Sequence, residues 1–236
     1  MPRRRLRRAA VVEAWTGVAP DSGDGARMTI TWEPKTAGPP EPRIVAVRAR
    51  TLDGRTLFDG AIVRVGTPAG TEKDIARFSV PAGRIELDLT VLDAAGAVID
   101  TDPRDVDVPN LRGPRKTGPA LPTPEVVRAR SPRELEKATA NPEAPPAALR
   151  TFSLRDSLLI RIPAFDATGA KVQVTARLLN QAGVPMRSIE ALGDAPGVTQ
   201  FALSLHSLAS GQYVIELIGT NGNGVVSERL PFRVTG

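Results

Sequence analysis

Residues 208–217, LASGQYVIEL, and their echo upstream, residues 80–89, VPAGRIELDL, decide the fold of this chain. Each stretch places a glycine just before a run in which apolar and polar side chains alternate. Alternation with a period of two is the signature of a β-strand that buries one face. In the later copy Tyr213, Ile215 and Leu217 share that face, and the earlier copy follows the same pattern. Both halves of the chain are therefore predicted to contain half-buried sheet.

The echo continues beyond these stretches at a near-constant spacing, 128 positions downstream and 129 upstream. Gly83 and Gly211 lie 128 positions apart, and so do Gly96 and Gly224 in the turns that follow. Matching offsets through strands and turns favour two copies of one module over a chance alignment of short strands. With 236 residues, the chain has room for two domains of ordinary size.

The corner before the later strand has a recognisable spacing, Leu-x-x-Gly-x-Tyr. It resembles the tyrosine corner of immunoglobulin-like sandwiches, in which a phenol hydroxyl bonds to backbone across a turn between sheets. A tyrosine that merely fills space would still mark a strand. Both tryptophans also fall on faces expected to be core. The residues predicted to support the structure are therefore Tyr213, Gly211, Leu208, Gly83, Trp15 and Trp32.

These patterns predict an all-β protein made of two tandem immunoglobulin-like or fibronectin-III-like β-sandwiches joined by a Pro-rich linker. The first sandwich is expected at 9–110, with eight short strands that include separate ones at 57–58 and 61–65, and the second at 150–236. Residues 111–149 are too rich in proline and glycine for a regular sheet, so they are predicted to form the linker. Within it, Ser131-Pro-Arg-Glu134 is a capping-box pattern that predicts one short helix over 132–140.

The net charge of +5 is unevenly placed. Residues 1–8 form a basic tail with five arginines, and the rest of the chain holds 26 basic and 26 acidic residues. A second basic surplus lies at 111–133. Arginine clusters can bind nucleic acid or anionic lipid. The chain has only nine aromatic residues, however, and those whose strand face can be assigned fall on core faces. No aromatic surface is therefore left on which single-stranded nucleic acid could stack. A solvated tail and linker are favoured, with no nucleic-acid partner.

Membrane insertion and secretion signals are also weak in this sequence. No apolar run approaches the ~18 residues that a membrane helix needs, so no membrane span is expected. Residues 9–19 follow the basic tail as a signal peptide would, but Glu13 interrupts them and makes a poor apolar region.

The residue inventory argues against catalysis. The chain has no cysteine and one histidine, His206, which excludes thiolate sites, a cysteine nucleophile and histidine-based metal sites. No GxSxG elbow accompanies the histidine. The glycine-rich run Asn221-Gly-Asn-Gly224 is better explained as a hairpin turn than as a phosphate cradle. No enzymatic activity and no cofactor are expected.

One cluster has metal-binding chemistry. It consists of Asp100, Asp102, Asp105 and Asp107. Four carboxylates within eight residues offer the hard oxygen ligands that Ca²⁺ prefers. Arg104 lies among them, however, and their alternation with apolar residues is typical of an exposed edge strand that deters aggregation. The edge strand is the favoured interpretation and a calcium site is the alternative.

Several segments carry a resemblance to a known family. They are WTG, TITWEP, DVPNL, TPEVVRARSPRE, TFSLRDSLLIRIPAF, LLNQAG, FALSLHSLASGQYVIEL and LPFRVTG. Together they resemble the C-terminal β-sandwich region of bacterial von Willebrand factor A-related proteins, from about residue 6 to residue 236. The resemblance implies modules that follow an A-type domain in exported proteins. The A domain's Asp-x-Ser-x-Ser metal motif is absent from this sequence, so the chain is expected to hold the tail modules alone.

Two classes of function follow from these patterns. The leading hypothesis is a non-catalytic interaction or spacer protein, extracellular or periplasmic, that presents edges or loops to a protein partner. The alternative is a carbohydrate- or calcium-binding sandwich, which for sugars requires exposed aromatic rings. The identity of the partner and the oligomeric state stay open at this stage.

Overall fold

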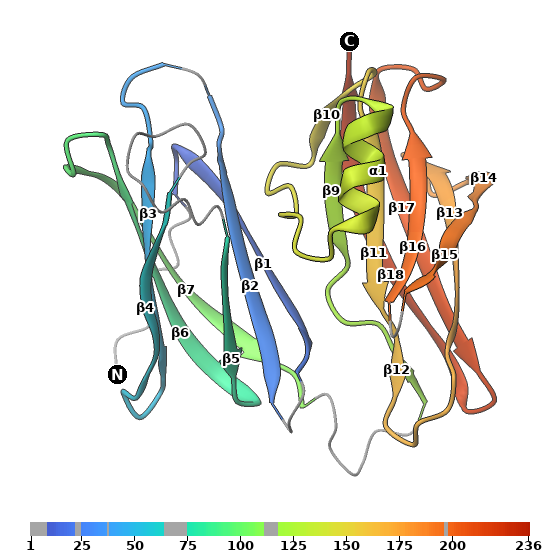
Figure 1. Ribbon diagram of the computed structural model, residues 1–236, viewed down its shortest axis with the longest axis horizontal. Helices are drawn as coiled ribbons and strands as arrows, with labels where there is room; N and C mark the ends of the chain where they lie inside the picture. Colours follow the sequence, from blue (N-terminus) through green and yellow to red (C-terminus); the bar gives the residue numbers. More distant parts are fainter. Residues whose placement is uncertain (1–8, 22–24, 37, 64–74, 111–117, 196–197) are drawn as a thin grey trace. The chain divides into compact units, whose positions relative to one another are not determined.

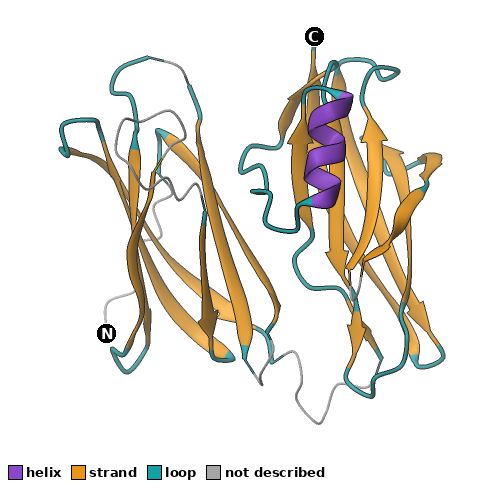
Figure 2. Ribbon diagram, viewed as in Figure 1, coloured by secondary structure: helices purple, strands orange, loops and turns teal. Residues whose placement is uncertain are grey.

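The computed structural model describes residues 9–21, 25–36, 38–63, 75–110, 118–195 and 198–236. Regular structure in these residues is almost entirely β-strand, with one helix, α1 (Pro132–Ala140) (Figure 2). The chain divides into two compact units, Met1–Asn110 and Leu111–Gly236. The all-β prediction is confirmed. The basic tail at 1–8 and residues 111–117 of the predicted linker lie outside the described residues.

The first unit is a sandwich of two antiparallel sheets with the orders β1-β2-β5 and β4-β3-β6-β7 (Figure 1). Its strands are β1 (Val12–Pro20), β2 (Ala26–Pro34), β3 (Ile44–Thr51), β4 (Thr56–Val63), β5 (Ala76–Val80), β6 (Gly83–Leu92) and β7 (Val98–Val108). It has seven described strands rather than the expected eight, because the segments predicted at 57–58 and 61–65 form the single strand β4. Gly60, between them, is not a turn: it leaves room for the Phe58 ring, which a Cβ there would meet at 2.8 Å.

The core of the first unit lies between its two sheets. Inward residues of β2 and β6, such as Met28 and Leu87, are completely buried. At one side of the sandwich Phe58 of β4 stacks on Phe78 of β5, with ring centroids 4.5 Å apart. This stack joins the edge strands of the two sheets, so the sandwich is closed on that side by aromatic packing.

The second unit repeats this plan with additions. Its sheets have the orders β10-β18-β17-β13-β14 and β15-β16-β11-β9, and β8 and β12 form a small ladder. The strands are β8 (Pro119–Ala120), β9 (Glu125–Ala129), β10 (Thr151–Ser153), β11 (Ser157–Pro163), β12 (Phe165–Asp166), β13 (Gln173–Asn180), β14 (Pro185–Ile189), β15 (Ala191–Ala195), β16 (Val198–Ser204), β17 (Gly211–Asn221) and β18 (Gly224–Thr235). The order β14-β13-β17-β18 matches β4-β3-β6-β7, and β9-β11-β16 matches β1-β2-β5. The repeat offset therefore corresponds to a repeated topology.

The second sandwich begins earlier than predicted. β9 lies inside the expected linker, yet it pairs antiparallel with β11. Its residues Val126, Val127 and Ala129 are buried, because the core covers one face of the strand and α1 the other. A five-residue strand buried on both faces shows no polar alternation, so it cannot be recognised by period. The predicted boundary at residue 150 is corrected: residues 119–149 are part of the second sandwich.

Helix α1 has the predicted bounds. The Ser131 hydroxyl accepts a hydrogen bond from the Glu134 N–H at 3.2 Å, and the Glu134 carboxylate accepts from the Arg130 N–H at 2.7 Å. The helix packs on β9 and β11, where Ala138 and Leu135 meet Val127 and Leu159. It covers the outer face of the β15-β16-β11-β9 sheet (Figure 1).

Candidate functional site

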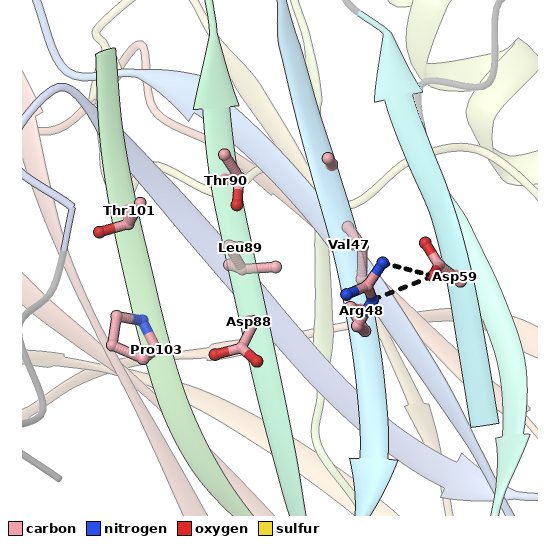
Figure 3. A pocket seen from close by; sticks show the side chains of 9 residues that line it. Val47, Arg48, Asp59, Asp88, Leu89, Thr90, Thr101 and Pro103 are labelled. Carbon is pink, nitrogen blue, oxygen red and sulfur yellow. Dashed lines mark hydrogen bonds and ion pairs between the residues drawn. The ribbon is translucent and has the colours of Figure 1, made fainter. Parts of the chain in front are cut away.

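A hollow of the first unit lies on the outer face of the β4-β3-β6-β7 sheet (Figure 3). Its volume is about 450 Å³. Strand pairing places Ala46, Thr90 and Thr101 side by side across β3, β6 and β7. These short side chains leave the surface low, while Arg48 and Pro103 stand beside them.

Charged pairs border this hollow. Arg48 donates to the Asp59 carboxylate at 2.9 Å (Figure 3), and Arg50 donates to Asp88 at 2.9 Å. The lining contains hydroxyl, carboxylate and guanidinium groups but no histidine, serine or cysteine. Such a surface can hydrogen-bond a polar group, and it offers no nucleophile with an adjacent base.

The aspartate cluster does not form a metal site in the described structure. Asp100, Asp102, Asp105 and Asp107 lie on β7, an edge strand as expected. Asp100 accepts from the backbone N–H groups of Ala10 and Val11, and Asp105 accepts from Arg84 at 2.6 Å. Across the described residues, no three acidic or histidine side chains gather in a way that could hold a metal ion. Asp100, Asp102 and Asp105 thus bond to separate partners along the strand.

Asp102 and Arg104 form the most buried of these pairs. The Asp102 side chain is 1% exposed and accepts from both Nε and Nη2 of Arg104, at 3.0 and 2.6 Å. Arg104 Nη1 then donates to the backbone carbonyl of Ala14 at 2.9 Å. Ala14 belongs to β1, the edge strand of the other sheet. This pair therefore joins two sandwich edges and satisfies one backbone carbonyl of β1.

The tyrosine corner is present in the second unit. The Tyr213 hydroxyl donates to the Ala209 carbonyl at 2.9 Å, and Leu208 packs against the core. Gly83, in the matching position of the first unit, has φ +117°, a conformation that favours glycine, whereas Gly211 does not have positive φ. The two corners share their place in the fold, but of the two glycines Gly83 alone has a backbone conformation that favours glycine.

The two tryptophans differ in their environment. Trp32 is buried and donates its indole N–H to the Ile62 carbonyl at 3.2 Å. Trp15 was expected in the core, but it is only half-buried and lies on the face of β1 opposite the buried Val12 and Ala14. Its ring lies over Gly17, where a Cβ would come within 2.2 Å of the indole. The expected parity is wrong because bulk alone does not decide which face of an edge strand is inward.

The remaining sequence candidates, His206 and the glycine-rich run at 221–224, both lie in turns. His206 is exposed in the turn after β16. The run at 221–224 is the β17–β18 hairpin turn, in which Gly224 has φ +150°. Its Asn221 and Asn223 amides donate to Asp166, and these bonds, after those from Thr168, hold the pKa of Asp166 well below its usual range. No described helix is long and apolar enough to cross a membrane.

One surface was not singled out from the sequence. Large apolar side chains are exposed on and beside the consecutive edge strands β14 and β15: Val184 is 55% exposed, and Met186 and Leu192 are each 51% exposed. β14 pairs only with β13, and β15 only with β16. Met186 and Leu192 each fall at an irregularity in the pairing register. The bulges are what turn Met186 and Leu192 outward. The alternation of apolar and polar residues in the sequence does not reveal a bulge, so these two residues could not be distinguished from core residues.

Comparison with known proteins adds little to this description. No protein-family model matches the chain, and no curated protein matches its sequence. Among solved structures, three immunoglobulin domains of titin (I67–I69) align over 95% of this chain and 66% of theirs, at 12% identity and a TM-score of 0.30. Fibronectin(III)-like modules of Clostridium thermocellum CbhA align over 88% and 85%, at 14% identity and a TM-score of 0.26.

An enzyme also appears among the matches. A β-glucuronidase of Parabacteroides merdae aligns over 95% of this chain but only 24% of its own, at 10% identity and a TM-score of 0.33. All three TM-scores are too low to support an argument about function.

Proposed function

We propose that this chain is a non-catalytic, partner-binding pair of β-sandwich modules from an exported bacterial protein, acting in the periplasm or outside the cell. The observation that carries the proposal is the exposure of three large apolar side chains, Val184, Met186 and Leu192, on and beside the consecutive edge strands β14 and β15. Exposed apolar side chains that gather on one side of a small domain are typical of protein interaction sites. The three residues lie within nine positions of the chain, on two consecutive edge strands.

The details of these strands favour contact through side chains. Pro185 lacks an N–H group, and bulges at Met186 and Leu192 interrupt both edges. Prolines and bulges deter indiscriminate strand addition. The bulges leave the apolar side chains exposed, so a partner would bury them without extending the sheet.

The export and the cellular location rest on the sequence alone. They are supported by the resemblance of the chain to the tail region of von Willebrand factor A-related proteins, which are usually exported.

The test places a photo-crosslinking amino acid at Met186, at Leu192 and, as control, at exposed Glu136 on α1. One protein captured at both edge positions and not at the control is expected. That protein, once purified, should bind the full chain and should lose binding to a Met186→Ser/Leu192→Ser variant that still folds. Capture at the control as well, or unchanged binding by the variant, would reject this surface as the docking site.

A second function is favoured by one observation, the outward position of Trp15. Strand pairing places the half-buried ring beside Thr31, on the face of the β1-β2-β5 sheet opposite the core, and aromatic rings on such a face are what a sugar-binding sandwich uses. In a Trp32→Phe variant, iodide quenching and a shift of Trp15 emission with one soluble glycan would support it. Emission that is indifferent to every glycan in the panel would remove this alternative.

A further inference from the structure

The outer face of the five-stranded sheet in the second unit carries a surplus of positive charge. Strand pairing places Arg177, Arg229 and Arg233 on this face, together with Glu216. Arg150 borders it, since its carbonyl accepts from the Arg233 N–H at 2.8 Å. Among the described strand residues that pairing places on this face, Glu216 is the one acidic residue, so cations outnumber anions there.

Two of these arginines share one carboxylate. Arg177, Glu216 and Arg229 stand directly opposite one another on β13, β17 and β18. Both arginines donate to Glu216, whose side chain is 5% exposed, while those of Arg177 and Arg229 are 43% and 64% exposed. Each guanidinium has five N–H donors. The buried carboxylate uses only some of them, so both arginines still present donors to solvent.

A hollow lies at one end of the same face. Its volume is about 250 Å³, and its lining includes Arg150, Arg233, Gln181 and Gln212 around Val214 and Pro231. Guanidinium and amide N–H groups bind carboxylates well, and a guanidinium can do so with two parallel bonds. The described residues that line the hollow include no acidic side chain.

The spacing of the cations suggests the shape of the ligand. Arg229 and Arg233 are four residues apart on β18, which corresponds to about 13 Å at the rise of an extended strand. Side chains four residues apart in an extended peptide have the same spacing. A peptide that runs along β18 can therefore bring one carboxylate to each arginine.

We propose that this face binds an extended acidic segment of a partner protein, with one carboxylate beside Arg233 in the hollow and another at the exposed guanidinium of Arg229. The inference rests on the proposed partner-binding function but uses a surface other than the β14–β15 edge. A second copy of the chain is the rival occupant, because residues 9–110 hold 16 acidic and 11 basic residues while residues 111–236 hold 10 and 15.

The probe is a fluorescein-labelled peptide of alternating Glu and Thr, titrated with the full chain, with a matched Gln/Thr peptide as control. Binding of the Glu peptide alone, weakening as salt rises, is expected. Arg233→Glu should weaken it about tenfold or more, because a charge in direct contact is reversed. Arg133→Glu changes the net charge equally at an exposed position of α1, which packs on the other sheet, and should leave affinity within about twofold. Circular dichroism confirms that both variants fold.

Several results would overturn the inference. Equal losses in the two variants would mean that only net charge matters, and equal binding of the Gln peptide would exclude carboxylate recognition. Binding of a sulfated polysaccharide without binding of the peptide would assign the face to another ligand. Salt-sensitive self-association that Arg233→Glu abolishes would make the occupant a second copy. The Met186→Ser/Leu192→Ser variant should bind the peptide normally. The two tests are therefore independent: failure of the β14–β15 proposal would not affect the peptide result, and failure of the peptide to bind would not affect the β14–β15 proposal.

Discussion

Single side chains close the edges of the first sandwich. Arg104 is held by the buried Asp102 and donates to the Ala14 carbonyl of β1. Asp100 accepts from N–H groups just before that strand. Two sheet edges that would otherwise present unpaired backbone to other chains are thus joined by charged side chains.

The first prediction concerns this pair. Asp102→Asn keeps the shape of the side chain but leaves the Arg104 guanidinium without its counter-charge. We expect the free energy of unfolding of the first unit to fall by about 3 kcal/mol, as when one partner of a buried ion pair is removed. Urea unfolding of the full chain measures the change. Asp107→Asn, at an exposed position of the same strand, is the control and should cost less than ~0.5 kcal/mol.

Glu216 makes the second unit sensitive to acid. Hydrogen bonds from Arg177 and then Arg229 hold the pKa of this carboxyl below its usual range. A carboxyl whose pKa is lowered by folding stabilises the folded state above its unfolded pKa, about 4.3 for glutamate, and loses that contribution as the pH falls through the folded value.

We therefore expect the urea midpoint of the second unit to fall as the pH is lowered from about 5 to about 2. A Glu216→Gln variant should be less stable at neutral pH but should lose less on acidification. Parallel pH curves for the two proteins would contradict this assignment. Asp166 contributes acid sensitivity of the same sign, because its pKa is also lowered, so some dependence should persist in the variant.

At the scale of elements, α1 and β9 stabilise each other through β11. Arg161, on β11, is 3% exposed and donates to the carbonyls of Ala138, Asn141 and Pro142 at the end of the helix. Carbonyls at a helix C-terminus have no partner within the helix. A buried guanidinium that satisfies them fixes a short helix that would be unstable alone.

Replacing Arg161 with methionine should release this helix while the β-sandwich core survives. We expect the amide hydrogens of α1 to exchange at least about tenfold faster, since the loss of one charged hydrogen-bond donor costs roughly 1.5–3 kcal/mol. Amides of β17 should be little affected. Arg155→Met, at an exposed neighbouring position, should leave exchange in α1 unchanged. Equal acceleration in β17 would show that Arg161 supports the whole unit rather than the helix.

At the scale of the molecule, two sandwiches with the same strand order form from sequences that differ in most positions. β3 and β13, and β6 and β17, occupy equivalent places in their sheets. The second sandwich differs by gaining α1, β10, β15 and the β8–β12 ladder. β9, which takes the place of β1, comes before the helix, so the unit is longer than the repeat spacing suggests.

Truncation tests this boundary. A fragment of residues 118–236 should fold cooperatively, whereas residues 150–236 should not. Removal of α1 exposes Leu159, which is buried in the intact unit, and removal of β9 leaves one edge of β11 unpaired. Near-ultraviolet circular dichroism and the sharpness of thermal unfolding distinguish the two. A folded 150–236 fragment would restore the boundary expected from the sequence.

The sequence by itself determined the repeated module, the strands with clear alternation and the capped helix. Each of these depends on residues close together in the chain: Tyr213 with Ala209, or Ser131 with Glu134. It also located the acidic edge strand, because alternation of charge with apolar residues is a local pattern.

Only the tertiary structure decided what those residues contact. Val127 of β9 is buried because α1 covers it, and Asp102 is buried because Arg104 reaches Ala14 across the sandwich. Trp15 lies outward and Met186 stands on a bulge, although neither differs in type from a core residue. These outcomes depend on partners distant in the chain, and a period of two cannot say which elements will cover a face.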